Sequence, residues 1–224
     1  MRRVVFGIAL AIVAGSFVVL PATAAHASWV STNCHVNNAP DSHYRRLDAK
    51  AYAHVGVDEG YEFGGGCWND NDRDDTPGQP DSGGEGPDCS GFTFKTWELK
   101  AAMGESGFQW WDRLQNIHGP YSSTSFHAPL QSWPFFKLAD KRYTTTMYMD
   151  AFAKQGHIGM LWGPSQPQDQ TDSIVEAKGD SSGTGIFIEG FRFDSDYIAV
   201  RREAWTPDCW PNCGMPQGRP ARVP

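Results

Sequence analysis

The sequence predicts an α+β domain in which helices come first and an antiparallel β-sheet follows. Two stretches with helical spacing precede residue 104, and four stretches rich in Ile, Val, Phe and Tyr follow residue 156. Helices in one part of a chain and strands in another are typical of this class. We therefore expect N-terminal helices packed on one antiparallel sheet.

The first residues predict a secretory signal peptide. Two arginines precede an apolar run at 4–20, and residues 25–27 read Ala-His-Ala, a small-x-small cleavage pattern. Cleavage there would release a soluble, extracellular protein with no stable membrane association. The alternative is an uncleaved anchor, because the apolar run is nearly long enough to cross a bilayer.

The length of the processed chain fits one domain with its own core. We place an N-terminal extension at 28–40, the domain at 41–205 and a Pro- and Gly-rich tail at 206–224. The 26 acidic residues outnumber the 19 basic ones, which disfavours a nucleic-acid partner because phosphate binding requires clustered Lys and Arg. The chain holds no internal repeat, and we expect a monomer.

The first predicted helix begins after Asp41, a residue type that favours the N-cap position, and runs to Gly56. Its apolar residues at helical spacing are Tyr44, Leu47, Ala51 and Val55. This spacing predicts that these four side chains form the buried face.

A glycine turn and a long loop follow the first helix. Residues 61–63 predict a short extended segment that enters the Gly-Gly-Gly turn at 64–66, and residues 68–87 are rich in Asp, Gly and Pro. Within this loop, residues 69–81 resemble the start of a calcium loop, but Asp75 stands where such a loop requires glycine. A solvated acidic insertion is our preferred interpretation, and no metal or cofactor is predicted.

The second predicted helix spans residues 90–103 and ends at Gly104. Phe94, Trp97 and Ala101 would lie along one of its faces. The first turn of this helix follows directly on an Asp-Cys pair, so the cysteine would lie at the helix N-terminus.

The second half of the chain predicts short helices and then strands. Residues 105–149 hold many aromatic side chains without a clean period, and we expect irregular structure with short helices there. The predicted strands are 157–162, 173–178, 185–192 and 197–203. Turn residues separate them, which indicates an antiparallel meander.

The odd number of cysteines leaves one thiol unpaired. The five are Cys34, Cys67, Cys89, Cys209 and Cys213. In an oxidising compartment four of them pair, and the fifth is a surface thiol or a nucleophile. If Cys89 is the free one, three pairings remain. The Cys-x3-Cys spacing of the last two permits a bridge between them, which would leave Cys34 to pair with Cys67.

The segment Asp88-Cys89-Ser90-Gly91 has features of a nucleophile site. The thiolate is the reactive form, and a free cysteine with a pKa near ~8.5 is mostly protonated at neutral pH. A helix N-terminus would stabilise the thiolate, and its backbone N–H groups would receive an oxyanion. The alternative is an inert buried cysteine or half of a disulfide.

Three motifs, in this order, resemble those of the NlpC-type cell-wall cysteine peptidases. They are Tyr-Glu-Phe-Gly-Gly at 61–65, Asp-Cys-Ser-Gly-Phe at 88–92 and His-Ile-Gly-Met-Leu-Trp-Gly at 157–163. The resemblance covers residues 41–203 and is thin between 104 and 149. It implies a papain-like fold, association with the cell wall and hydrolysis of amide bonds in peptidoglycan stem peptides.

The resemblance also implies roles for individual residues. Cys89 would attack, His157 would act as general base and then acid, and Glu176 would orient His157. The family usually has a histidine at the position of Glu176, so this chain departs from the pattern there. The residues that would contact the substrate or the oxyanion are Tyr61, Asp88 and Ser90.

Structural alternatives remain for three of these residues. His157 is otherwise a histidine at a strand end, Glu176 a partner of Lys178 on one sheet face, and Tyr61 a core residue. Each alternative places the side chain in the same element but gives it no part in chemistry.

The segment before the predicted histidine strand also departs from the family pattern. Asp150 matches the family's aspartate loosely, and residues 148–153 are expected to shape the substrate groove. Two other functions therefore remain open. One is a thiol acyltransferase or amidase that acts on a substrate outside the wall, and the other is a secreted binding or effector protein without turnover.

Overall fold

The described part of the chain comprises Cys34 and residues 44–68, 86–100, 108, 110–164 and 170–208 of a computed structural model. Other parts of the sequence carry predictions that lie outside these residues. They are the signal peptide, the Asp41 cap, the acidic segment 69–81, the stop at Gly104 and the pairing of Cys209 with Cys213.

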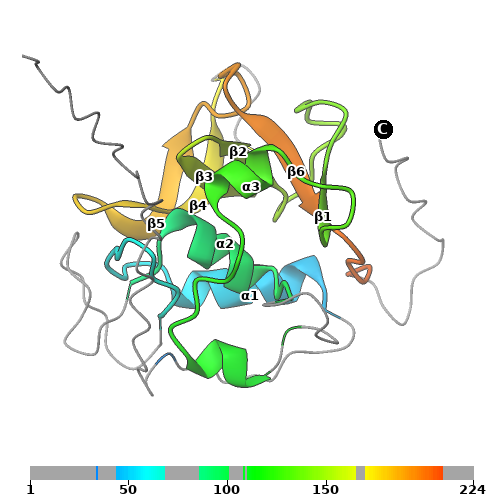
Figure 1. The fold of residues 1–224 in the computed structure, drawn as a ribbon. Coiled ribbons are helices and arrows are strands. Elements are labelled where there is room, and N and C mark those ends of the chain that lie inside the picture. The colour runs from blue at the N-terminus through cyan, green and yellow to red at the C-terminus, as the bar shows by residue number, and fades with distance from the viewer. Residues whose placement is uncertain are drawn as a thin grey trace, which may run out of the picture.

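The described elements confirm the α+β class, with helices and one antiparallel sheet (Figure 1). The helices are α1 (Arg46–Val55), α2 (Cys89–Thr96), the 3₁₀ helix η1 (Trp110–Leu114) and α3 (Ser123–His127). The strands are β1 (Phe135–Lys137), β2 (Ala151–Lys154), β3 (His157–Pro164), β4 (Asp172–Gly179), β5 (Gly183–Glu189) and β6 (Ile198–Arg202). Within the described ranges, no helix combines the length and apolarity that a bilayer crossing requires.

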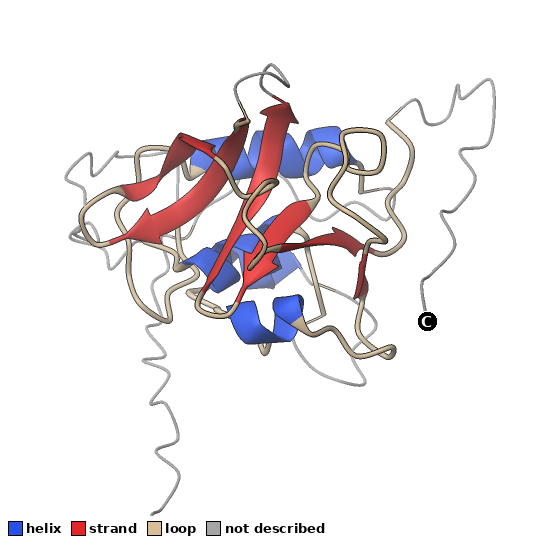
Figure 2. Ribbon diagram, turned by 90° about the horizontal axis from the view of Figure 1, so that it is seen from above, coloured by secondary structure: helices blue, strands red, loops and turns tan. Residues whose placement is uncertain are grey.

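The sheet has the strand order β1-β6-β2-β3-β4-β5, and neighbouring strands are antiparallel. Figure 2 shows the strands in red and the helices in blue. The four predicted strands are present as β3 to β6, although β5 ends at Glu189, before the predicted Arg192. The predicted meander is wrong for β6, which returns across the sheet to lie between β1 and β2. The sequence pattern does not predict β1 and β2, because strands of three and four residues are too short to show a two-residue period.

The pairing of β3 with β4 ends before either strand does, and we call this end of the two strands the β3–β4 fork. Their pairing stops at Met160 and Val175. β3 nevertheless reaches back to His157 beside β2, and β4 reaches on to Gly179 beside β5. The start of β3 therefore has backbone groups that the β3–β4 ladder does not use, and these groups need other partners.

The buried face of α1 differs from the predicted one. The helix begins at Arg46, and the predicted Leu47 is 50% exposed. Its buried residues are Arg46, Ala49, Tyr52 and Ala53. The difference arises because the Arg46 guanidinium forms a buried ion pair with the Asp150 carboxylate at 2.8 Å. A pattern that counts only apolar residues does not place an arginine inside.

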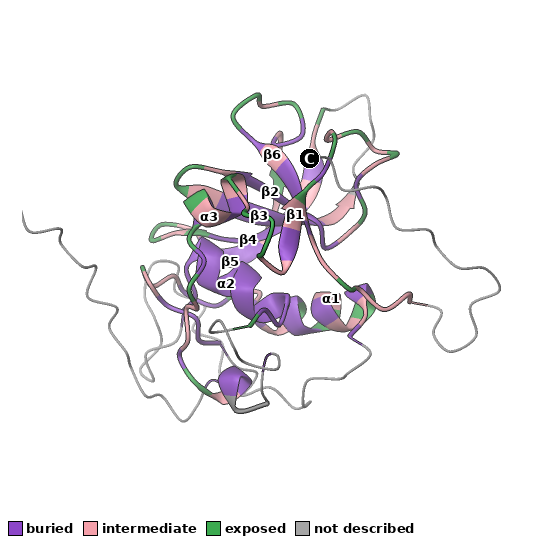
Figure 3. Ribbon diagram, turned by 45° about the vertical axis from the view of Figure 1, so that its right-hand side comes forward, coloured by how far each residue is buried: buried purple, intermediate pink, exposed green. Residues whose placement is uncertain are grey.

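Helix α2 is buried on all sides, and its burial is not limited to the face of Phe94 and Trp97 that the spacing indicates. Each of its eight residues is buried, including Lys95 (Figure 3). The helix packs on α1, β3 and β4, and the ring of Phe92 meets that of Trp68 edge-on at 5.0 Å between centroids. Short helices of this kind depend on tertiary packing rather than on helix propensity for their stability.

Helix α2 also stops at Thr96, earlier than predicted. Glu98 adopts a left-handed conformation with φ of +46°. The N–H of Glu98 donates to the Lys95 carbonyl at 2.9 Å, and the N–H of Leu99 donates to the Phe94 carbonyl at 3.2 Å. These are the two hydrogen bonds of a Schellman motif, in which glycine usually takes the left-handed position. The sequence carries no glycine there to signal the end.

Alternate residues of the sheet enter two hydrophobic clusters, one on each face. Ala151 and Val175 belong to the cluster that contacts the helices, whereas Phe152 and Ile174 enter the second cluster. The second cluster is completed by Phe191, from the loop after β5. The sheet is thus covered by helices on one face and by loops on the other.

Cys34 and Cys67 form a disulfide, in agreement with one of the predicted pairings. Cys89 is a free cysteine. The bridge joins positions 33 residues apart and attaches the N-terminal lead to the end of the glycine turn.

Asp150 holds α1, β2 and β6 together. Its carboxylate accepts hydrogen bonds from Arg46 at 2.8 Å and from Arg201 at 2.9 and 2.6 Å, and the Met147 N–H donates to it at 2.8 Å. The side chain is only 1% exposed. Asp150 therefore has a structural role, which does not support the expectation that it lines a substrate groove.

Replacing Asp150 by alanine should leave two buried guanidinium groups without their counter-ion. Loss of one partner of a buried ion pair costs about 3–5 kcal/mol, and urea unfolding of Asp150→Ala at neutral pH measures this loss. The matched control is Asp140→Ala, because Asp140 pairs with Arg142, whose side chain is 76% exposed. Equal unfolding midpoints for the two variants would contradict the structural role of Asp150.

Candidate active site

Asp88 is the N-cap of α2 and fixes the turn that precedes it. Its Oδ1 accepts hydrogen bonds from the Gly91 N–H at 2.7 Å and from the Ser90 hydroxyl at 3.0 Å. Its Oδ2 accepts from the Gly64 N–H at 3.0 Å. The carboxylate therefore joins the first turn of the helix to the glycine turn, which is an N-cap role, and its predicted contact with a substrate or oxyanion stays a prediction.

The glycine of the Asp-Cys-Ser-Gly motif permits a close approach of two backbone segments. A Cβ atom at Gly91 would lie 2.1 Å from the Gly65 carbonyl oxygen, so no other residue fits there. The same carbonyl accepts the Asp88 N–H at 3.0 Å. The motif at 61–65 and the motif at 88–92, which are separate in the sequence, are thus packed directly against each other.

The Cys89 thiol lies at the β3–β4 fork. The backbone N–H groups of Ser90 and Ile158 donate hydrogen bonds to its sulfur. The sulfur is thus the partner of the Ile158 N–H, a backbone group of β3 that the β3–β4 ladder does not use. Burial raises the pKa of Cys89 to about 12, with the negative charge of Asp88 as the next cause. The expected lowering of the thiol pKa by the helix terminus is thus outweighed by burial.

His157 and Glu176 form a hydrogen-bonded pair across the fork. The imidazole Nε2 contacts the Glu176 carboxylate, and the ring meets Phe191 edge-on at 5.7 Å between centroids. Gly159 makes room for this pair, because a Cβ atom there would lie 3.1 Å from the Glu176 Oε2 and 2.5 Å from Ile174. The glycine two residues after the histidine therefore has a steric cause.

The alternative reading of Glu176 as a surface partner of Lys178 is wrong. Lys178 pairs with Glu189 on β5, whereas Glu176 is 1% exposed. Burial raises the pKa of the Glu176 carboxyl, and the hydrogen bond and charge of His157 oppose that rise. The Glu176 Oε1 is buried and has no hydrogen-bond partner among the described residues.

Tyr61 interacts electrostatically with Cys89. Burial, followed by the negative charges of Cys89 and Asp88, raises the pKa of its hydroxyl well above the usual 10. The phenol is half-buried and its ring also packs against the main hydrophobic cluster. Tyr61 therefore both packs in the core and interacts electrostatically with Cys89. Its hydroxyl stays protonated and can donate a hydrogen bond.

The structure adds His118, which the sequence does not single out. Its Nε2 lies 3.1 Å from the Asp88 Oδ2 and 2.9 Å from the Ser90 hydroxyl, and its Nδ1 lies 2.9 Å from the Gly119 carbonyl oxygen. This histidine stands in the aromatic-rich segment without strand or helix periodicity. No local pattern indicates that it returns to the nucleophile helix.

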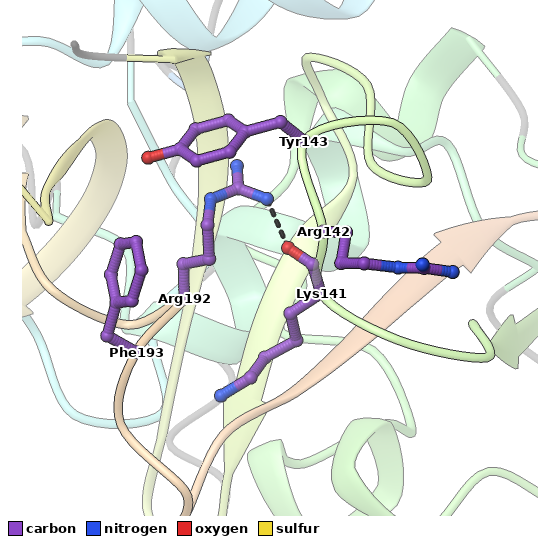
Figure 4. Close-up of a pocket in the computed structure, with 5 residues that line it drawn as sticks. All are labelled: Lys141, Arg142, Tyr143, Arg192 and Phe193. Atoms are coloured by element: carbon purple, nitrogen blue, oxygen red, sulfur yellow. Dashed lines mark hydrogen bonds between the residues drawn. The ribbon is translucent and has the colours of Figure 1, made fainter. Parts of the chain in front are cut away.

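A separate cavity of about 240 Å³ lies between the loops that follow β1 and β5 (Figure 4). It is lined by Lys141, Arg142, Tyr143, Arg192 and Phe193. Arg192 pairs with Asp172 at 2.8 Å. Arg142 pairs with Asp140 at 2.6 Å, and Lys141 donates to a backbone carbonyl at 3.1 Å. Both arginines thus have carboxylate partners, whereas the hydrogen bonds of Lys141 go to backbone carbonyls.

The described residues contain no group of three or more His, Cys, Asp or Glu side chains arranged to hold a metal ion. Comparisons of the chain with family models, with curated proteins and with solved structures give no match. Any functional assignment therefore depends on the geometry of these side chains themselves.

The pKa of Glu176 predicts a pH dependence of stability. Its value in the fold is raised above 4.5, so the folded state binds this proton more tightly than the unfolded chain. Stability from this group is therefore lost as the pH rises from 4.5 through the raised pKa. Urea unfolding of Glu176→Gln across that window should show a smaller decline than the wild type.

Glu189→Gln is the control for this measurement, because it removes a carboxylate from the neighbouring strand and should keep the wild-type pH slope. If Glu176→Gln and the wild type lose stability in parallel, the charged carboxylate is not the cause.

Proposed function

We propose that this protein is a secreted cysteine peptidase with a papain-like fold, of the NlpC type, which hydrolyses amide bonds in peptidoglycan stem peptides. The observation that carries the proposal is that Cys89 lies at the same end of β3 and β4 as the His157–Glu176 pair. The thiol accepts the N–H of Ile158, the residue next to His157, and the charge of Glu176 acts on its pKa.

Cys89 is the nucleophile and His157 its base. Because Nε2 of His157 contacts Glu176, Nδ1 is the nitrogen that takes the thiol proton while sulfur attacks the carbonyl carbon. His157 then gives this proton to the leaving nitrogen as the C–N bond breaks, which leaves a thioester on Cys89. Water, deprotonated by His157, attacks the thioester, and the C–S bond breaks to release the acid and the thiol.

The raised thiol pKa favours proton transfer during attack over a preformed thiolate–imidazolium pair. A buried thiol needs its base in contact with the reacting atoms, and Glu176 stabilises the imidazolium that forms. The oxyanion is received by the Cys89 backbone N–H at the start of α2, and the Tyr61 hydroxyl provides a second donor. Hydrogen bonds of this kind contribute about 3–4 kcal/mol to such reactions.

The papain-like assignment is supported by the arrangement of elements. A nucleophile at the N-terminus of a buried helix packs on an antiparallel sheet whose strands carry the base and its partner. Gly91 and Gly159 are both required by close contacts in this arrangement. The motif glycines therefore have physical causes that connect the three motifs.

The wall substrate is supported by the motif resemblance and by one exposed side chain. Phe63 lies in the glycine turn, two residues from Tyr61, and is 83% exposed. It offers apolar surface beside the site for a peptide. With a net charge of −7, the chain has no bulk attraction for an anionic wall, so recognition must occur through such local contacts.

Incubation with isolated cell walls tests this function. Cys89→Ala and His157→Ala should each lower the release of stem-peptide fragments by at least about 1,000-fold, measured by mass spectrometry. His54→Ala is the matched control, because His54 is exposed on α1 and its loss should leave the rate unchanged. Equal release by the wild type and Cys89→Ala would overturn the proposal.

The same assay separates the other two functions. Products joined to an added amine or alcohol would indicate acyl transfer, and cleavage of simple amides without action on walls would indicate a different substrate. Wall binding without any product, together with no alkylation of Cys89 by iodoacetamide, would indicate a binding or effector protein.

A further inference from the structure

Each nitrogen of the His118 ring faces an oxygen that only accepts hydrogen bonds. Nδ1 lies 2.9 Å from the Gly119 carbonyl oxygen, and Nε2 lies 3.1 Å from the Asp88 carboxylate and 2.9 Å from the Ser90 hydroxyl. A neutral imidazole carries one proton. With that proton on Nδ1, Nε2 could accept from Ser90, but its lone pair would also face the Asp88 carboxylate. The imidazolium satisfies both acceptors while Ser90 donates to Asp88 at 3.0 Å, so the arrangement favours the charged form.

The loop segment before His118 is anchored to α2 and to the glycine turn. The buried Lys95 ammonium donates to the carbonyls of Gly66 at 2.6 Å and Gln115 at 2.9 Å. The Gly66 N–H donates to the Asn116 side chain at 2.7 Å. These contacts hold the segment before His118 against the glycine turn, so the imidazolium has a fixed position beside the N-cap of α2.

We propose that His118 is a positioning residue that keeps Cys89 reactive by neutralising Asp88. The Asp88 carboxylate is indispensable as the helix cap, yet its negative charge opposes formation of the thiolate one residue away. The imidazolium offsets that charge without displacing the cap. Its importance for turnover rests on the proposed function, whereas its effect on thiol chemistry does not.

The charge of His118 depends on the groups around it. Burial disfavours the imidazolium, but the hydrogen bond and charge of Asp88 outweigh burial and raise the pKa of His118 above 6.5. Other charged or titratable side chains on the elements packed here are Tyr61 and Glu62 on the glycine turn and Lys95 on α2. The Asp88–His118 ion pair is complete below pH 6.5 and is lost as the pH rises through the raised pKa.

This protonation state also excludes a second nucleophile in the cluster. The Ser90 hydroxyl lies 2.9 Å from Nε2 of His118 and 3.0 Å from Oδ1 of Asp88, a geometry that resembles a serine–histidine pair. An imidazolium has no lone pair with which to take the serine proton. Ser90 therefore donates to Asp88 and belongs to the cap.

Alkylation of Cys89 by iodoacetamide tests the proposal on the intact chain without any substrate. The rate is followed from pH 6 to 10 by mass spectrometry of the peptide that contains Cys89. His118→Asn should react about 5- to 10-fold more slowly at neutral pH, because an uncompensated charge beside the thiol disfavours the thiolate. The wild-type rate should rise less steeply with pH where His118 loses its proton, and this break should disappear in His118→Asn.

Two further variants make the result specific. His54→Asn should reproduce the wild-type pH profile, because it removes a histidine from the exposed face of α1. In an Asp88→Asn background, His118→Asn should produce no further change, since the charge that His118 offsets is gone. Superimposable profiles for the wild type and a folded His118→Asn would overturn the proposal.

If His118→Asn does not fold, the nitrogen NMR shifts of His118 in the wild type decide the question, and a neutral ring at pH 6 would overturn the proposal. The proposed peptidase activity fails separately. The protein could leave walls intact while its alkylation profile still shows the change of slope due to His118. That result would contradict the wall substrate and would leave the positioning role of His118 in place.

Discussion

The complete burial of α2 is the constraint on which the rest of the structure depends. A helix with no solvent-facing side must satisfy its polar groups internally, and the chain supplies a partner at each end. Asp88 accepts from the first turn, Glu98 closes the last turn, and Lys95 donates to carbonyls of two adjoining loops. The same burial places Cys89 in a setting of low polarity, where its neutral form is favoured. Stability and thiol chemistry therefore have one common origin.

Features that depend on neighbours in the sequence could be predicted. The start of α2 beside Cys89 follows from an Asp cap and small residues, and four strands follow from runs of β-branched and aromatic residues. Glu176 and His157 fall on adjacent strands, so their pairing follows from the spacing of the motifs once the strands are known. The glycines after Cys89 and His157 belong to the same local patterns, and their steric causes appear only in three dimensions.

Features that depend on distant partners could not be predicted. The buried face of α1 depends on an ion pair between Arg46 and Asp150, which are 104 positions apart. Strand β6 lies between β1 and β2, a position that a meander would not give it. The end of α2 uses Glu98 where a sequence pattern looks for glycine. His118 reaches Asp88 from a segment without periodicity. In each case the decisive contact is between polar groups that hydrophobic periodicity does not register.

The protonated state of Cys89 has a consequence for its survival as a lone thiol. Peroxides and disulfides react with thiolates, and oxidation to sulfenic acid follows thiolate character and exposure. A cysteine that is 7% exposed, with its pKa raised to about 12, offers little of either. Low exposure and the raised pKa therefore both disfavour oxidation of this sulfur in the folded chain.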